Sequence, residues 1–341
     1  MTRDQTLDST RDASRPHLPD FLVIGAPKAG TSALHEALRA HPQVHVPSGA
    51  RPYEKEPKYF MCEDAPPPAY CGPGDAHSQQ EWVWRRRDYE ALFAAAPEGT
   101  LRGESTPFYL WSKGAKRRIA EQLPDVKLIA IVRDPIDRAY SNWMHLWVDG
   151  LEPEADFLTA FAAEAERVDR GYAPFWRYGD LGRYGEQLRD LYSLVDPQRV
   201  LVLRFASLID EPAATLDAVC RHLGIETGLI STVPANNTRT FAEPGLLTSA
   251  LGTVIRADAA AGAYAPPQVW RRASRPLIGY RQRGDVPRPK LTPACRERLL
   301  DYFERDIRLL ESLTGLDLEG WRSTADRGSY LERSRTVEPA P

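Results

Sequence analysis

The stretch Phe21-Leu-Val-Ile-Gly-Ala-Pro-Lys-Ala-Gly-Thr-Ser32 decides the fold. Its first four residues are apolar and predict a short buried strand, and the glycines that follow predict a loop. A helix is expected next, because Leu34 and Leu38 are four positions apart and the pattern ends before His41. A loop between a strand and a helix N-terminus can surround an anion with backbone N–H groups, so the stretch predicts a phosphate-binding loop.

Two further apolar runs, at 126–132 and 199–205, predict buried strands that are each followed by a helix. After the first run, Asp134 is expected to cap a helix that begins at Pro135. Short apolar strands that alternate with helices are typical of a parallel sheet covered on both faces. We therefore expect an α/β fold, with a P-loop-type parallel sheet flanked by helices.

A single domain is expected over residues 20–322, with an amphipathic helix at about 293–314 near its end. Residues 1–19 and 323–341 are polar and predict disordered arms at the two termini. Residues 62–80 are rich in proline and glycine and predict a loop. Residues 224–292 show no clear periodicity, and the sequence favours no particular structure there.

The bulk composition argues against several classes of protein. The 44 basic and 47 acidic residues give a net charge of −3, which is unlike a nucleic-acid-binding protein. No two of the four cysteines have the spacing of zinc ligands, and we expect no metal. The sequence shows neither a signal peptide nor an apolar run of transmembrane length, so a cytoplasmic protein without a membrane span is expected. The sequence is compatible with a homo-oligomer.

The position of the lysine in the phosphate-binding loop is unusual. The spacing matches the nucleoside-triphosphatase loop, but Thr31 stands where that loop has its lysine, and Lys28 lies three positions earlier. A cation in the middle of the loop suits a donor with one phosphate bonded to another anionic group. It suits a triphosphate with its magnesium ion less well.

A second candidate anion site is Arg133-Asp-Pro-Ile-Asp-Arg-Ala-Tyr-Ser141, directly after the second strand. Ligands of open α/β sheets gather at the carboxyl ends of the strands. The guanidinium of Arg133 offers several donors to a phosphate, and Ser141 adds a hydroxyl from the early helix. Arg138 is expected instead to pair with Asp137 or with a carbonyl group.

Together these two motifs resemble the signatures with which the sulfotransferase superfamily binds its donor, 3′-phosphoadenosine 5′-phosphosulfate (PAPS). The resemblance covers about residues 20–322 and is closest to the branch of heparan sulfate sulfotransferases and soluble bacterial relatives. It implies that Arg133 and Ser141 hold the 3′-phosphate. It also implies that the phosphosulfate is held by Lys28, Ala29, Gly30, Thr31 and Ser32. Further matching stretches are 55–60, 103–109, 141–143 and the region 293–321.

The same resemblance points to Glu56 as the general base and to Lys28 as the group that stabilises charge on the leaving phosphate. Glu54 and Glu104 are other carboxylates in or near the matching stretches. Histidine is the base in other branches, which makes His145 the alternative, although a histidine packed within its helix is favoured at that position.

The acceptor is less well defined by the sequence. A hydroxyl or amine of a small molecule, lipid or carbohydrate is compatible, and segments 62–80 and 224–290 are expected to select it. Aromatic residues around the motifs are expected to divide between an acceptor pocket and the core. Arg283 and Gly284 lie in a basic stretch that resembles the loop that closes over the 3′-phosphate, but the spacing departs from the family pattern.

Two rival functions remain at this stage. A P-loop kinase would need lysine in place of Thr31 and an acidic residue at a strand end to organise magnesium, for which Asp134 is the candidate. A nucleotide-binding sensor without catalysis would keep Lys28 and Arg133 but would not need the base.

Overall fold

The computed structural model describes residues 18–47, 55–62, 64–76, 81–234, 243–261, 267–281, 289 and 291–323. The predicted terminal arms lie almost entirely outside these ranges.

Five parallel strands form one sheet in the order β2-β3-β1-β4-β5. The first strand of the chain therefore lies at the centre of the sheet, with β3 and β4 on either side. This arrangement confirms the predicted α/β fold, although two short strands, β2 and β3, were not expected from the sequence. The strands are β1 (Phe21–Gly25), β2 (Val44–His45), β3 (Leu101–Glu104), β4 (Lys127–Val132) and β5 (Val200–Arg204).

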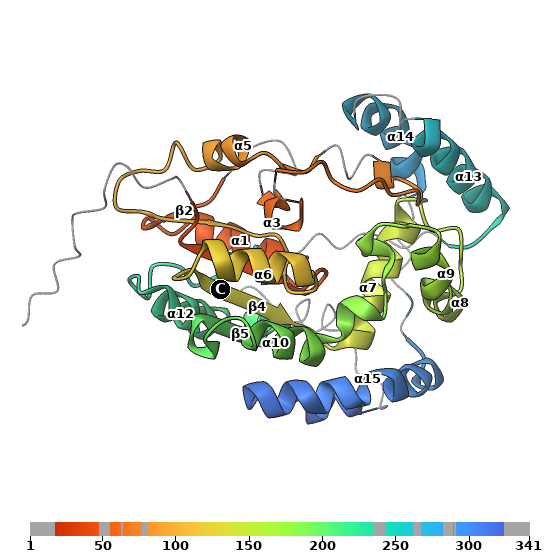
Figure 1. Ribbon diagram of the computed structural model, residues 1–341. Coiled ribbons are helices and arrows are strands. Elements are labelled where there is room, and N and C mark those ends of the chain that lie inside the picture. The colour runs from red at the N-terminus through yellow and green to blue at the C-terminus, as the bar shows by residue number, and fades with distance from the viewer. Residues whose placement is uncertain are drawn as a thin grey trace, which may run out of the picture.

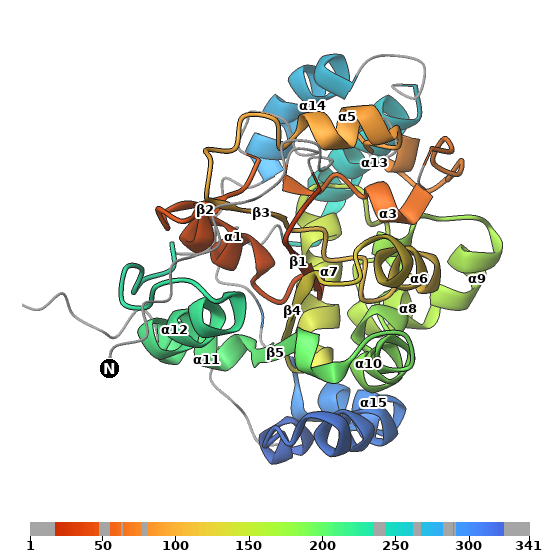
Figure 2. The ribbon, with the colours of Figure 1, turned by 60° about the vertical axis from the view of Figure 1, so that its left-hand side comes forward.

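Helices cover both faces of this sheet, as Figures 1 and 2 show. In Figure 2, α1 and α12 lie on one side of the strands, and α6 and α10 lie on the other. The larger helices around the sheet are α1 (Thr31–Arg39), α6 (Lys113–Gln122), α7 (Pro135–Val148), α10 (Tyr184–Tyr192), α12 (Pro212–Leu223) and α15 (Pro293–Thr314). Shorter helices are α3 (Tyr59–Cys62), α5 (Arg86–Ala91), α8 (Phe157–Ala162), α9 (Glu164–Asp169) and α11 (Phe205–Asp210).

The stretch 224–292, for which the sequence favoured no structure, contains two helices that pack against each other. They are α13 (Leu246–Ala261) and α14 (Pro267–Arg281). The predicted loop at 62–80 is largely irregular over the residues that the structure describes there.

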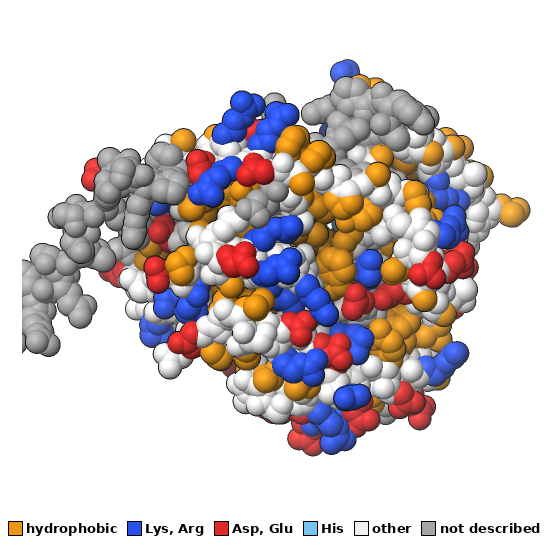
Figure 3. Space-filling view, viewed as in Figure 1, with side chains coloured by type: hydrophobic (Ala, Val, Ile, Leu, Met, Phe, Trp, Pro, Cys, Tyr) orange, Lys and Arg blue, Asp and Glu red, His pale blue; other side chains and the backbone are white. Residues whose placement is uncertain are grey.

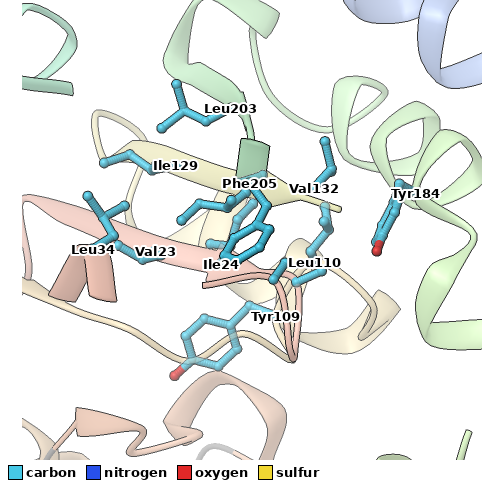
Figure 4. Close-up of a cluster of buried hydrophobic side chains, with 14 of the residues drawn as sticks. Val23, Ile24, Leu34, Tyr109, Leu110, Ile129, Val132, Tyr184, Leu203 and Phe205 are labelled. Atoms are coloured by element: carbon cyan, nitrogen blue, oxygen red, sulfur yellow. The ribbon is translucent and has the colours of Figure 1, made fainter. Parts of the chain in front are cut away.

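The buried core reaches directly beneath the phosphate-binding loop (Figure 4). The loop packs so closely on Phe205 that a Cβ atom on Gly30 would lie 2.7 Å from the phenylalanine ring, and the φ angle of Gly30 is +96°. A Cβ atom on Gly25 would likewise lie 2.7 Å from the Cβ atom of Leu110. Both glycines are therefore required by close contact, and Gly30 also by its left-handed backbone conformation.

Candidate active site

The loop between β1 and α1 presents the uncapped end of a helix. Gly30 is the N-cap of α1, and within the described residues no side chain caps this end and no acidic residue lies in its first turn. The partial positive charge of a helix N-terminus favours an anion there. Lys28, in the middle of the loop, has a φ angle of +66°, which is uncommon for a residue other than glycine and often marks a functional position.

Arg133 connects the two predicted anion-binding motifs. It follows the last residue of β4, which pairs directly with β1. Its Nη1 atom donates a hydrogen bond to the carbonyl oxygen of Lys28 at 3.2 Å. Its guanidinium lies 4.9 Å from the centre of the Phe205 ring, the same ring that supports Gly30. The fold thus brings the loop and the strand end into direct contact, although they are about a hundred residues apart in sequence.

Both carboxylate oxygens of Asp134 are engaged in structural contacts. The residue is therefore not available for the magnesium site that the kinase alternative needs, and that alternative is not favoured. One carboxylate oxygen accepts hydrogen bonds from the backbone N–H groups of Ile136 and Asp137, as expected for the N-cap of α7. The other oxygen lies 2.5 Å from Nη2 of Arg296, in a buried ion pair. A carboxylate with both oxygens engaged in this way is poorly placed to organise a magnesium ion.

Farther along α7, Arg138 and Ser141 lie in different environments. Arg138 is fully buried and donates hydrogen bonds to the carbonyl oxygen of Tyr178 at 2.5 Å and to Oδ1 of Asn142 at 3.0 Å. Its partner is therefore a carbonyl group, one of the two expected alternatives. Ser141 is half-buried.

Glu56 lies between two lysines and is linked to the phosphate-binding loop. Its Oε1 atom is 2.8 Å from Nζ of Lys55, and its Oε2 atom is 3.6 Å from Nζ of Lys58. Lys55 also donates a hydrogen bond to Oγ of Ser32 at 2.9 Å. Burial alone would raise the pKa of Glu56, but Lys55 and Lys58 outweigh it and hold this pKa below its ordinary value. The carboxylate is consequently ionised at neutral pH.

The segment that carries Glu56 rests on the end of β3. The backbone N–H of Ser105 donates to the carbonyl of Lys55 at 3.1 Å, and the N–H of Lys58 donates to Oγ1 of Thr106 at 3.2 Å. The hydroxyl of Ser105 is 2.9 Å from Nδ1 of His35, on α1. Two of the stretches on which the resemblance rests are therefore in contact, and hydrogen bonds with 103–109 hold the backbone of 55–60.

Glu104 lies beneath this region and is fully buried. The hydroxyl of Tyr89 lies 3.4 Å from its Oε1 atom. Burial raises the pKa of Glu104 to about 8, despite hydrogen bonds that lower it. This carboxyl group is therefore mostly protonated at neutral pH and belongs to the interior rather than to the acceptor side.

His145, on α7, lies next to the lysine of the phosphate-binding loop. Its Nδ1 atom is 3.4 Å from Nζ of Lys28, and its Nε2 atom is 3.7 Å from Oδ2 of Asp149. The imidazole also meets the ring of Phe175 edge-on, with ring centres 5.4 Å apart. His145 thus packs against Asp149 on its own helix and also contacts the phosphate-binding loop, and its role in the reaction stays a prediction.

The aromatic residues around the motifs are mostly core. The buried ones are Tyr59, Phe60, Phe108, Tyr109, Trp143 and Trp147. Two aromatic residues near the site were not predicted from the sequence, because they lie outside the motifs. Phe175 contacts His145 and Phe108, and Trp82 lies 5.9 Å from the ammonium group of Lys58.

The surface is hollowed between α6 and α7, at the carboxyl ends of the strands (Figure 3). Hydrophobic side chains line the hollow, and Lys and Arg side chains gather at its rim. Glu54, Arg283 and Gly284 lie outside the described residues, so their predicted places in the site stay predictions. Within the described ranges, no group of three metal-binding side chains is arranged to hold a metal ion. No helix there is long and apolar enough to span a membrane.

A model described as the sulfotransferase family matches residues 19–228. Among curated proteins, heparan sulfate glucosamine 3-O-sulfotransferase 3A1 of Mus musculus is 28% identical over 222 residues, which cover 65% of this chain and 49% of that protein. Heparan sulfate glucosamine 3-O-sulfotransferase 6 of Homo sapiens is 26% identical over 311 residues, which cover 90% of this chain and 75% of that protein. The chain thus spans about half the length of the first of these relatives. Among solved structures, a sulfotransferase from Alicyclobacillus acidocaldarius superposes with a TM-score of 0.69 at 26% identity, and the match covers 90% of this chain and 99% of that one.

Proposed function

The chain belongs to the sulfotransferase family, and on that premise we propose that it takes a sulfuryl group from PAPS and transfers it to an acceptor by in-line displacement. The acceptor would be a hydroxyl or amine of a small molecule, lipid or carbohydrate. The names of the curated relatives make a carbohydrate hydroxyl the first class to test.

The hydrogen bond between Arg133 and the carbonyl of Lys28 is the observation that carries this proposal. PAPS has two anionic ends, the 5′-phosphosulfate and the 3′-phosphate, and therefore needs two cationic sites at a fixed separation. The uncapped end of α1 with Lys28 suits the first anion, and the guanidinium of Arg133 with the hydroxyl of Ser141 suits the second.

Each residue of the site has a distinct part in the proposed reaction. Glu56, which is ionised, would accept the proton from the acceptor hydroxyl, and His145 is the alternative base. Lys28 would supply positive charge where negative charge develops on the leaving phosphate. Lys55 would keep Glu56 in register with the donor, because it contacts both Glu56 and Ser32.

We also propose a reducing compartment such as the cytoplasm. All four cysteines lie in the described residues and all are free thiols, and three of them are buried: Cys62, Cys220 and Cys295. Thiols of this kind are typical of proteins that do not depend on disulfides.

Calorimetry with two nucleotides tests the donor assignment. Adenosine 3′,5′-bisphosphate should bind about tenfold or more tightly than adenosine 5′-monophosphate, because only the former occupies the Arg133 site. The preference should persist in the presence of a chelator and should largely disappear in Arg133→Ala. Equal affinity of the unmodified protein for both nucleotides would overturn the two-site assignment.

A further inference from the structure

Exposed apolar side chains are concentrated on the hairpin formed by α13 and α14. The structure shows eight large hydrophobic side chains that are exposed among the described residues. Five of them belong to this hairpin: Leu246, Leu247, Val254, Val269 and Tyr280. Leu246 is 94% exposed, far more than the isolated apolar residues elsewhere. A cluster of this kind on a soluble surface usually marks a site of interaction.

Helix α13 has an apolar inner face and an uncharged outer face. Its inner face buries Gly252, Ile255 and Ala259 at helical spacing. Its outer face carries no charged residue and consists of Leu246, Leu247, Ser249, Ala250, Thr253, Val254, Ala257 and Ala260. A face with several exposed apolar side chains and no charge is better suited to contact with an apolar partner than to water alone. The outer face of α13 is therefore a candidate docking surface.

The two charged residues of α13, Arg256 and Asp258, are not part of its outer face, and the hydroxyl of Thr253 on that face is bonded within the helix. Arg256, which is half-buried, donates a hydrogen bond to the carbonyl oxygen of Gly150 at 3.1 Å. It also bonds to the hydroxyl of Thr253, which in turn donates to the carbonyl of Ser249 at 3.1 Å. Asp258, the only acidic residue of the helix, is half-buried.

Helix α14 adds positive charge beside this apolar surface. Its sequence, PQVWRRASRPLIGYR, has several arginines and no acidic residue, although the whole chain has a net charge of −3. Val269, Arg272 and Tyr280 are exposed and spaced so that they lie on one side of the helix, and Arg275 is exposed next to them. Long basic side chains among apolar ones allow a surface to enter the headgroup layer while the charges stay with the phosphates.

The hairpin adjoins the end of α7, the helix that carries His145. Gly150, which accepts the hydrogen bond from Arg256, follows Asp149, the ion-pair partner of His145. Figures 1 and 2 both show α13 and α14 at one end of the molecule, opposite α15. A flat partner could therefore meet the hairpin without contact with α15.

We propose that the outer face of the α13–α14 hairpin docks on an anionic lipid membrane surface. The apolar residues of α13 would enter the interface, and the arginines of α14 would pair with anionic headgroups. A second copy of the chain fits less well, because a two-fold interface through this face would bring arginine against arginine. The docking is peripheral and does not depend on the proposed transfer reaction.

Flotation of the full chain with lipid vesicles tests this proposal. The vesicles are pure phosphatidylcholine, or phosphatidylcholine with phosphatidylglycerol at about three to one. Binding is expected to the anionic vesicles and to fall with added salt. Leu247→Glu with Val254→Glu, and separately Arg272→Glu with Arg275→Glu, should each weaken binding about tenfold or more.

Matched controls change equally exposed residues elsewhere. Leu194→Glu with Leu229→Glu, and Arg117→Glu with Arg305→Glu, should bind vesicles like the unmodified protein. All variants should unfold at similar temperatures and bind adenosine 3′,5′-bisphosphate equally, because the changes are on the surface. Three results would overturn the proposal: no binding to anionic vesicles, equal binding to both kinds of vesicle, or equal loss in the controls. A dimer in solution that the Leu247→Glu, Val254→Glu variant dissociates would assign the face to a second copy and would also overturn it.

Discussion

The two halves of the site are built in different ways. The donor half, defined as residues 28–32 with Arg133 and Ser141, lies at the ends of strands β1 and β4, which pair directly. Main-chain geometry and close packing on Phe205 hold it in place. The acceptor half, defined as Lys55, Glu56, Lys58 and His145, is held largely by ion pairs and side-chain hydrogen bonds.

This difference determines how each half responds to pH, to salt and to mutation. Strand pairing and burial do not depend on ionisation, so the donor half should keep its shape over a wide range of pH and salt. The ion pairs of the acceptor half are partly exposed and are weakened by protonation and by salt. We therefore expect mutations in the acceptor half to affect turnover, and mutations in the donor half to affect donor binding.

The largest expected effect is that of Glu56→Gln. Glutamine keeps the shape of the side chain but cannot accept a proton, so turnover should fall by about 10²–10⁴-fold. Affinity for adenosine 3′,5′-bisphosphate should change little. Steady-state kinetics with a carbohydrate or phenol acceptor, combined with calorimetry, measures both quantities.

One control variant and one further measurement test the assignment of the base to Glu56. Glu90→Gln removes a carboxylate that pairs with Arg86 on α5 and should leave turnover unchanged. The dependence of turnover on pH is a second readout. The pKa of Glu56 is held below 4.5, so with this base turnover should fall only when the pH drops below that value. An imidazole base would instead make turnover fall at a higher pH, because histidine is the side chain that ordinarily changes charge near neutrality. Near-normal turnover in Glu56→Gln, together with an inactive His145→Ala, would transfer the role to the histidine.

The next largest effect is expected on the donor side, from Arg133→Ala. Loss of the guanidinium leaves a bound phosphate without its charged partner and should weaken donor binding by roughly 2–5 kcal/mol. Arg133→Lys keeps the charge but loses the planar fork, and should cost less. Calorimetry with adenosine 3′,5′-bisphosphate gives both values. Normal donor binding by Arg133→Ala would show that this strand end is not part of the donor half.

Glu104 and Glu56 should affect stability in opposite directions as the pH changes. The raised pKa of Glu104 means that the folded protein keeps a proton that the unfolded chain loses. Its contribution is therefore complete below about pH 4.5 and is lost as the pH rises to about 8, by up to about 5 kcal/mol. The lowered pKa of Glu56 acts in the opposite sense: its contribution is complete above the ordinary pKa and is lost as the pH falls through the lowered pKa.

Thermal unfolding at pH 5 and pH 9 tests this contrast. The loss of stability between these two values should be smaller in Glu104→Gln than in the unmodified protein, because glutamine does not ionise. Glu98→Gln, an exposed change nearby, should leave the loss unaltered. An identical loss in Glu104→Gln would mean that other groups account for the pH dependence.

The sequence predicted the local structure of the donor half better than the contacts of the acceptor half, for a physical reason. A strand end, a glycine loop and a helix cap are local features, so Gly30 and Asp134 could be placed from their neighbours alone. The contact of His145 with Lys28 joins residues 117 positions apart and leaves no local pattern. The support of Glu56 by Ser105 and Thr106 is equally invisible before the chain is folded.

The same reasoning explains why helix α15 was predicted from the sequence and helix α13 was not. Helix α15 has an apolar inner face and a charged outer face, and its predicted limits agree with the structure. Helix α13 is apolar on its inner face and uncharged on its outer face, so its sequence has no strong periodicity to detect. A helix without a charged outer face cannot be recognised from the alternation of polar and apolar residues.

The smallest expected effect is that of Ser141→Ala, and it tests whether the donor half extends beyond the strand ends into α7. The side chain is half-buried and lies two turns into a helix that Asp134 and Arg296 fix at its start. Loss of one hydrogen bond to a charged phosphate should weaken the binding of adenosine 3′,5′-bisphosphate by about 1–3 kcal/mol. Adenosine 5′-monophosphate lacks the 3′-phosphate, so its affinity should not change, and Ser193→Ala, at the surface after α10, should affect neither nucleotide. Equal weakening of both nucleotides would mean that Ser141 supports the site only through the packing of α7, and the 3′-phosphate would then depend on Arg133 alone.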